Sequence, residues 1–324
     1  MRAVVFTGAG GPEVVEVQER PAPAPRDEQV LVAVAFAGLN PADLAQRAGK
    51  YPAPQGSPAD VPGLEVAGVV QRCGGAVRDW RPGDRVFGLV GGGGLADRVA
   101  VHERHVCAIP AALDEPGAAA VPEAFITAHD ALIVQAGLRP GETVLVHGAS
   151  GGVGTAACQL AVSLGSRVLA CVRSRTAADH VAVLGAEPVD EAAFPEAVHQ
   201  LGAVDVVLEL VGAPHLSGNL EVLAPKGRIV VVGTGAGSEA PISLAALMGK
   251  RATMRGTMLR ARPLEEKAAA VRAFAREVVP QLAAGRLRPV VDSSFPLDEV
   301  DAAFARLEGR GKRGKVLLQF STGR

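Results

Sequence analysis

The segment from Val144 to Gly154, followed by an apolar helical stretch, constrains the fold more than any other part of this chain. It reads VLVHGASGGVG and has the form AxGxxG, with Ala149, Gly151 and Gly154 at the fixed positions. A glycine at 151 lets the backbone approach a pyrophosphate, and a glycine at 154 lets the helix pack closely on the strand. The helix N-terminus offers N–H groups and partial positive charge to phosphates. The segment therefore predicts a dinucleotide-binding loop between a strand and a helix.

The surrounding sequence alternates between strand-like and helix-like stretches. Strands are predicted at residues 142–148, 166–172, 205–212 and 227–235, and helices at 123–137, 155–165 and 176–185. Such alternation indicates βαβ units, a parallel sheet and an α/β fold. A long helix is predicted at 263–285, with a kink or break near Pro280.

The first 110 or so residues have a different character. Short stretches rich in β-branched residues are separated by glycine- and proline-containing turns, at 1–6, 14–19, 29–38, 66–74 and 83–90. Closely spaced strands of this kind favour a barrel or a sandwich. The length of 324 residues suits two domains.

The end of the second predicted strand indicates which cofactor is bound. NAD-binding versions carry an acid about twenty residues after the glycine loop, which accepts from the ribose 2′-OH. Here the sequence reads Arg173, Ser174, Arg175, and the first acid is Asp179. A guanidinium matches a 2′-phosphate in charge and geometry, and so NADPH is predicted over NADH. The alternative is that these arginines are solvated loop charges.

Composition excludes several functional classes. The formal net charge of −1 disfavours a non-specific nucleic-acid binder. No apolar stretch is long enough to span a bilayer, and the N-terminus does not resemble a signal peptide, which predicts a cytoplasmic protein without membrane contact. The four cysteines are scattered and form no CxxC pair, which disfavours disulfides and a thiolate zinc site.

Candidate metal ligands are also missing where a zinc dehydrogenase would need them. Leu64 stands where a histidine would be sought, and Glu65 alone does not make a metal site. Ser150 lies in GASGG before a helix, which predicts a cofactor-loop serine and not a nucleophile. We therefore predict no metal.

With these features combined, the chain resembles the zinc-free, zeta-crystallin-like quinone oxidoreductases of the medium-chain dehydrogenase/reductase superfamily, with closest similarity to the tumour-suppressor-inducible branch. The resemblance covers nearly the whole length. It rests on AGLNPADLAQRAGKYP (37–52), PGLEVAGVV (62–70), PGDRVFGL (82–89), ETVLVHGASGGVGTAACQLA (142–161), GRIVVVG (227–233) and GKVLLQF (314–320).

The resemblance implies a Rossmann NADPH-binding domain at 123–257 and a discontinuous GroES-like β-barrel substrate domain at 1–122 and 258–324. It implies that the strand at 315–320 returns to the substrate domain, and that two chains form a homodimer through their Rossmann sheets. One feature departs from the family: many relatives have a tyrosine after the third Rossmann strand, whereas this chain reads GAEPVDEAAF there.

The resemblance also implies site residues. Asn40 would lie near the nicotinamide and the substrate carbonyl, and Tyr51 would line the substrate cleft. The remaining cofactor contacts implied are Thr127, Ser150, Gly151, Gly152, Val153, Arg173, Ser174, Arg175, Val211, Gly233, Thr234 and Lys315.

We expect hydride transfer from NADPH to a small hydrophobic electrophile, with a quinone as the acceptor. Asn40 and Tyr51 are the candidate hydrogen-bond donors to the acceptor oxygen. Each has a structural alternative, since Asn40 before Pro41 can shape a turn and Tyr51 can rest on the surface. Two other functions remain open: a reductase of enals, enones or enoyl thioesters, and an NADPH-binding sensor with little turnover.

Overall fold

The computed structural model describes residues 1–320 and divides into two compact units. The barrel unit comprises Met1–Ile126 and the segment from Leu259 onward, and the Rossmann unit comprises Thr127–Met258. The predicted domain boundaries, at 122/123 and 257/258, lie within four residues of these.

The Rossmann unit contains a six-stranded parallel sheet in the order β10-β9-β8-β11-β12-β13. This is the strand order 3-2-1-4-5-6 of doubly wound dinucleotide-binding folds. The strands are β8 (Thr143–Val146), β9 (Arg167–Val172), β10 (Glu187–Asp190), β11 (Val204–Glu209), β12 (Leu223–Val231) and β13 (Thr253–Gly256). The α/β prediction and four of these strands are confirmed, whereas β10 and β13 had not been predicted.

Successive side chains of the strands point to opposite faces of this sheet, and helices pack on both faces. Leu145, Leu169 and Val207 belong to one apolar cluster with residues of α6, α7 and α8. Since neighbouring residues in a strand point to opposite faces, Val144 and Val206 face the other way. On that face α3 packs against α4, and α4 contacts β8 and β9.

The helices of this unit alternate with its strands; those within 123–137, 155–165 and 176–185 had been predicted, and the later three had not. They are α3 (Thr127–His129), α4 (Gly152–Ser163), α5 (Arg175–Val183), α6 (Glu196–Leu201), α7 (Leu216–Val222) and α8 (Leu244–Lys250). Around α3, residues 122–135 have wider, π-type helical turns.

The barrel unit is built on a seven-stranded sheet in the order β14-β15-β3-β4-β5-β7, with β6 also paired to β3. The strands are β3 (Gln29–Leu39), β4 (Glu65–Cys73), β5 (Arg85–Leu89), β6 (Arg98–His102), β7 (Val106–Ala108), β14 (Val291–Pro296) and β15 (Lys315–Gln319), and β1 (Arg2–Phe6) and β2 (Val15–Glu19) form a separate hairpin. The predicted return of the last strand is confirmed, because β15 pairs antiparallel with β3.

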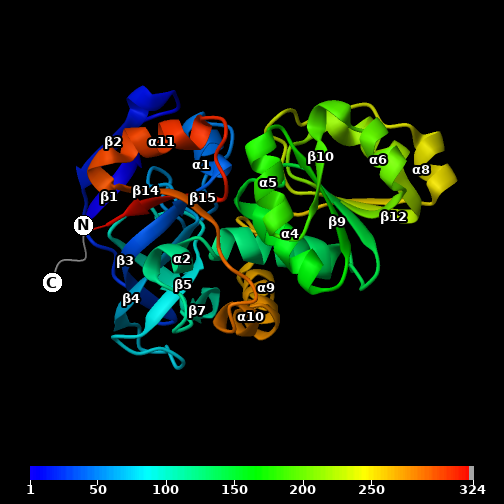
Figure 1. Cartoon of the computed structure of the whole chain (residues 1–324). Helices are drawn as coiled ribbons and strands as arrows, with labels where there is room; N and C mark the ends of the chain where they lie inside the picture. Colours follow the sequence, from blue (N-terminus) through cyan, green and yellow to red (C-terminus); the bar gives the residue numbers. More distant parts are fainter. Residues whose placement is uncertain (321–324) are drawn as a thin grey trace. The chain divides into compact units, whose positions relative to one another are not determined.

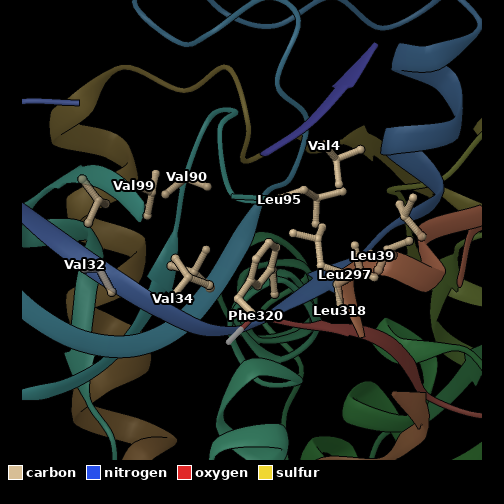
Figure 2. Packing of buried hydrophobic residues seen from close by; sticks show 14 of the residues in the cluster. Val4, Val32, Val34, Leu39, Val90, Leu95, Val99, Leu297, Leu318 and Phe320 are labelled. Atoms are coloured by element: carbon tan, nitrogen blue, oxygen red, sulfur yellow. The ribbon is translucent and has the colours of Figure 1, made fainter. Parts of the chain in front are cut away.

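The core of the barrel unit is aliphatic. Figure 2 shows inward-facing residues of β3, including Val32 and Val34, packed with Val4, Leu95 and Leu318. Helix α11 (Val300–Glu308) adds Phe304, whose ring meets Phe6 edge to face at 5.9 Å. In Figure 1, α11 lies beside α1 (Pro41–Arg47) over this sheet.

The remaining helices of the barrel unit are α2 (Glu115–Ala119), α9 (Leu264–Glu277) and α10 (Val279–Ala283). The long helix predicted at 263–285 is interrupted at Val278, as the proline at 280 led us to expect. None of the helices within residues 1–320 combines the length and the apolar character needed to cross a membrane.

Candidate functional site

The glycine loop of the Rossmann unit joins β8 to α4. Gly148 has φ of +63°, which favours glycine, and a Cβ at Gly154 would stand 2.6 Å from Cα of Ala149. Gly154 is therefore required for the close approach of helix and strand. Gly151 stands at the N-cap of α4 and provides no side-chain cap, which leaves the first helical turn suited to an anion.

The predicted pyrophosphate residues lie together in this loop. Ser150, Gly151, Gly152 and Val153 are consecutive at the start of α4 and all are partly exposed. A Cβ at Gly151 would have the Gly148 carbonyl oxygen 3.4 Å away as its nearest neighbour. The loop fits a dinucleotide, because its backbone is compact and is not covered by side chains of its own.

The residues predicted to bind a 2′-phosphate lie at the end of β9 and the start of α5. Arg173 is 72% exposed by its side chain, and Arg175 is 89% exposed. Ser174 caps α5, since its Oγ accepts from the backbone N–H of Ala177 at 3.2 Å. Both arginines have acidic neighbours. Asp179, the first acid after them, lies 3.0 Å from Arg175 Nε, and Glu191, which sequence reasoning missed, lies 3.7 Å from Arg173 Nε.

The carboxyl ends of β11 and β12 bring further predicted residues together. The N–H of Val211 donates to Glu209 Oε1 at 2.7 Å, and the Val211 carbonyl accepts from Ala236 N–H at 2.9 Å. Gly233 lies so near this turn that a Cβ there would meet the carbonyl carbon of Leu210 at 2.7 Å. Thr234 follows Gly233 directly, whereas Thr127 is buried at the start of α3.

Behind these strand ends lies a buried group of His147, Glu209 and His215. His147 Nε2 lies 2.7 Å from Asn219 Oδ1, and Asn219 Nδ2 donates to Glu209 Oε2 at 2.8 Å. This arrangement makes His147 Nε2 the donor. Burial lowers the pKa of His147 to about 4. Burial also acts to lower the pKa of His215, but Glu209 and Glu191 outweigh it and raise that pKa.

Three ligand atoms of this group lie within 4.8 Å of one another, as a metal site would require. The two imidazole rings, however, are stacked with centroids 4.1 Å apart and an interplanar angle of 17°. The lone pair of an imidazole nitrogen lies in its ring plane, and these two planes are nearly parallel and separated. They do not converge on one ion, so this geometry does not fit a shared metal.

The barrel unit contains a buried polar cluster around Asn40, Glu65 and Lys315. Lys315 Nζ lies 2.5 Å from Glu65 Oε1 and donates to Asn40 Oδ1 at 2.5 Å. Asn40 Nδ2 donates to Glu65 Oε1 at 3.0 Å and to the Gly38 carbonyl at 3.2 Å. Both amide hydrogens of Asn40 therefore have partners within the protein, and Lys315 is a buried ion-pair partner, not a solvated charge.

Two other carboxyl groups border this cluster. Asp43 Oδ2 accepts from Asn40 N–H at 2.8 Å and Oδ1 accepts from Gly63 N–H at 3.0 Å, so Asp43 orients the loop. Burial raises the pKa of Asp43 to about 6. The backbone N–H of Glu123 donates to Glu65 Oε2 at 2.7 Å, and burial together with Glu65 raises the pKa of Glu123 to about 7.

Sequence reasoning did not identify Glu65 as a member of this cluster. A usable signal was present: Glu65 begins an otherwise apolar segment, EVAGVV, and a charged residue in a buried strand needs a partner. The partner could not be identified, because Lys315 comes from the far end of the sequence.

Tyr51 is half-buried next to Arg260. The guanidinium carbon of Arg260 lies 4.9 Å from the centre of the Tyr51 ring, and Arg260 also donates to the Tyr51 carbonyl at 3.2 Å. Arg260 therefore fixes Tyr51 through both the face of its ring and its backbone carbonyl. Within residues 1–320 the Tyr51 hydroxyl makes no hydrogen bond, which leaves this donor available to a ligand.

Two family models match parts of this chain. Residues 26–111 match the family of alcohol dehydrogenase GroES-like domains, and residues 178–318 match the family described as zinc-binding dehydrogenases. The quinone oxidoreductase of Lama guanicoe is 34% identical over 330 residues, which cover 98% of this chain and 97% of that protein.

Solved structures show the same similarity. The quinone oxidoreductase of Thermus thermophilus, whose structure was also determined with NADPH, superimposes with a TM-score of 0.86 at 37% identity, over 99% of this chain and 100% of that one. CurK enoyl reductase superimposes with a TM-score of 0.87 at 27% identity, over 98% of each chain.

Proposed function

Because the chain belongs to the medium-chain dehydrogenase/reductase superfamily and is a nicotinamide-dependent oxidoreductase, we propose that it uses NADPH to reduce quinones without zinc. The observation that carries the proposal is the glycine loop at the start of α4, with two arginines and no acid at the end of the neighbouring strand β9. The quinone acceptor is supported by the 34% identity to quinone oxidoreductases over nearly the full length of both chains.

In this proposal the Rossmann unit binds the cofactor. Ser150 to Val153 hold the pyrophosphate by backbone N–H groups, and Arg173, Ser174 and Arg175 bind the 2′-phosphate. Val211, Gly233, Thr234 and Thr127 contact the ribose and nicotinamide half. When bound, NADPH supplies the hydride that reduces the acceptor.

The barrel unit binds the acceptor. A quinone is already electrophilic, so the protein has to position it and exclude water, and the reduced oxygen can take its proton from solvent. Tyr51 donates a hydrogen bond to the acceptor oxygen and stabilises the charge that develops there. Asn40, whose amide is held by Lys315 and Glu65, fixes the shape of the loop that bears it.

Three observations support a reaction without zinc. Leu64 is buried where a ligand histidine would be sought. Two buried acids of the barrel unit already have partners within the protein: Glu65 pairs with Lys315, and Asp43 accepts from backbone N–H groups. The stacked histidines of the Rossmann unit do not supply a metal site either.

A homodimer formed along the edge of the Rossmann sheet completes the proposal. Strand β13 pairs with β12 on one side only, and all four of its residues are exposed. Met254 in β13 and Met248 in α8 are large exposed apolar residues, at 43% and 75%. An open edge with apolar neighbours favours strand pairing with a second chain.

The deciding experiment follows NADPH and NADH oxidation with an ortho-quinone, a para-quinone, an enal and an enoyl thioester. Rapid turnover of NADPH with the quinones supports the proposal. Turnover of the alkenes alone would contradict it in favour of the reductase function, which the available Tyr51 hydroxyl and the similarity to an enoyl reductase favour. An NADPH-dependent rise in melting temperature without turnover would instead indicate a sensor.

A further inference from the structure

A chain of four ionisable side chains runs along the carboxyl edge of the Rossmann sheet. Arg173 Nε lies 3.7 Å from Glu191 Oε2, and Glu191 Oε1 lies 3.5 Å from His215 Nε2. His215 Nδ1 in turn lies 3.4 Å from Glu209 Oε2. The chain of side chains connects Arg173, which is predicted to bind the 2′-phosphate, to the turn at Val211. The backbone N–H of Val211 donates to Glu209.

Glu191 is the fixed member of its pair with Arg173. It opens the short 3₁₀ helix Glu191–Ala193 directly after β10, and its side chain is only 23% exposed. Its other oxygen faces His215, whose side chain is 9% exposed. The Arg173 side chain is 72% exposed and can reorient, whereas the Glu191 carboxylate is held by the buried His215.

Glu191 lies in the segment where the sequence departs from the pattern of its relatives, GAEPVDEAAF. We propose that Glu191 is a specificity-determining residue that neutralises Arg173 and thereby reduces the preference of this site for NADPH over NADH. The inference rests on the proposed function, because it requires a dinucleotide bound at this edge of the sheet.

Two physical effects lead to this result. A 2′-phosphate that binds Arg173 must come near a carboxylate that cannot move away, and two negative charges in one partly solvated site repel each other. A carboxylate at this edge can also accept a hydrogen bond from the free 2′-OH of NADH. The exposed ion pair with Arg173 is itself weak, so a phosphate can displace it, but the repulsion remains.

The test is Glu191→Gln, which keeps the size and polarity of the side chain and removes its charge. Dissociation constants are measured for NADPH, NADH, 2′,5′-ADP and 5′-AMP at one fixed ionic strength. We expect NADPH and 2′,5′-ADP to bind roughly threefold to tenfold more tightly, as one partly solvated charge would give. NADH and 5′-AMP should bind equally well or less tightly.

The matched control is Glu187→Gln, at the start of β10, the strand that Glu191 follows. Glu187 pairs with Arg167 at 2.7 Å, so this variant makes the same change in net charge away from Arg173. Equal tightening in both variants would show a general charge effect and overturn the inference. An unchanged ratio of the NADPH and NADH constants in Glu191→Gln would also overturn it.

Stability is checked by melting temperature, and Glu191→Ser replaces the glutamine variant if that one does not fold. If the wild-type protein binds neither dinucleotide, the proposed function fails and this inference falls with it. If the wild type binds NADPH but the Glu191 variants have the same selectivity for NADPH over NADH as the wild type, the proposed function stands. This inference alone then fails.

Discussion

Lys315 and Asn40 are separated by 275 positions in the sequence, yet the lysine ammonium lies 2.5 Å from the asparagine side-chain oxygen in the interior of the barrel unit. The same ammonium neutralises Glu65, which is fully buried. This one cation therefore holds together a loop, a central strand and the last strand of the sheet.

Replacement of Lys315 by methionine should lower the free energy of unfolding by about 3–5 kcal/mol, because it leaves the Glu65 carboxylate buried without a counter-charge. The measurement is urea denaturation followed by circular dichroism. The double variant Lys315→Met, Glu65→Gln should recover part of the loss. Arg310→Met, an exposed cation, is the control. A loss no larger than that of the control would show that the buried pair contributes little.

Tyr51→Phe should separate the two candidate reactions. Without the hydroxyl, kcat for an enal should fall by roughly 10²-fold, because that reaction needs a proton donor at the α-carbon and Tyr51 is the only tyrosine of the chain. Turnover of a quinone should fall much less, because its reduced oxygen is protonated by solvent. Steady-state kinetics with both acceptors gives the comparison. The phenylalanine ring keeps its contact with Arg260, so equal losses for both acceptors would argue against a role of the hydroxyl as proton donor.

The double variant Arg173→Ala, Arg175→Ala should weaken NADPH binding by roughly 10- to 100-fold, since charge-assisted hydrogen bonds to the 2′-phosphate are lost. NADH, which lacks that phosphate, should bind with nearly unchanged affinity. Fluorescence titration with both cofactors measures the effect. The double variant Arg167→Ala, Arg310→Ala removes two positive charges elsewhere and controls for net charge. Unchanged NADPH affinity in the double variant would mean that these arginines are solvated charges.

His147 should make the protein less stable in acid. The folded protein holds His147 neutral with a pKa of about 4, whereas the unfolded chain binds a proton near pH 6.5. Between these values the unfolded state binds more protons, so the stability due to neutral His147 is lost as pH falls from 6.5 towards 4. The total loss is about 3 kcal/mol.

His147→Gln retains a side-chain N–H for Asn219 and cannot titrate. Its free energy of unfolding, measured by urea denaturation from pH 7 to pH 4, should therefore fall less steeply than that of the wild type. Parallel pH profiles for the two proteins would show that His147 keeps an ordinary pKa when folded.

Met254→Lys should shift the protein from dimer to monomer, because it places a charge beside the open edge of β13. Analytical ultracentrifugation over a range of concentrations measures the dissociation constant. Val183→Lys is the matched control, since Val183 is 86% exposed on α5 and lies outside that edge. If both variants dissociate to the same extent as the wild type, the dimer does not use β13.

The regular parts of the Rossmann unit could be predicted from sequence because their signals are local. The strand, glycine loop and helix at 143–163 follow one another, and steric needs at Gly154 show directly in the residue type. Strands β10 and β13 lie at the edges of the sheet, and β13 is fully exposed. Side chains on such strands are not selected for burial, so no apolar pattern marks them.

The candidate site was predicted only in part, for a related reason. Asn40 and Lys315 were identified as site residues by resemblance, but the sequence did not indicate that they contact each other or that Glu65 contacts both. Arg173 was identified by its chemistry, whereas its partner Glu191 directly follows the next strand of the sheet. Contacts between distant segments depend on the register of strands, which residue type alone does not fix.

The position of β15 also affects how the protein is made. On the ribosome, β3 and β4 emerge early, and the whole of the Rossmann unit is synthesised before the strand that carries Lys315 appears. At typical rates of translation this interval is on the order of tens of seconds. Throughout it, Glu65 lacks its cation and β3 lacks one of its neighbours. The Rossmann unit can complete its own sheet in that time. It should therefore fold before the barrel unit, whose two segments flank it in the sequence.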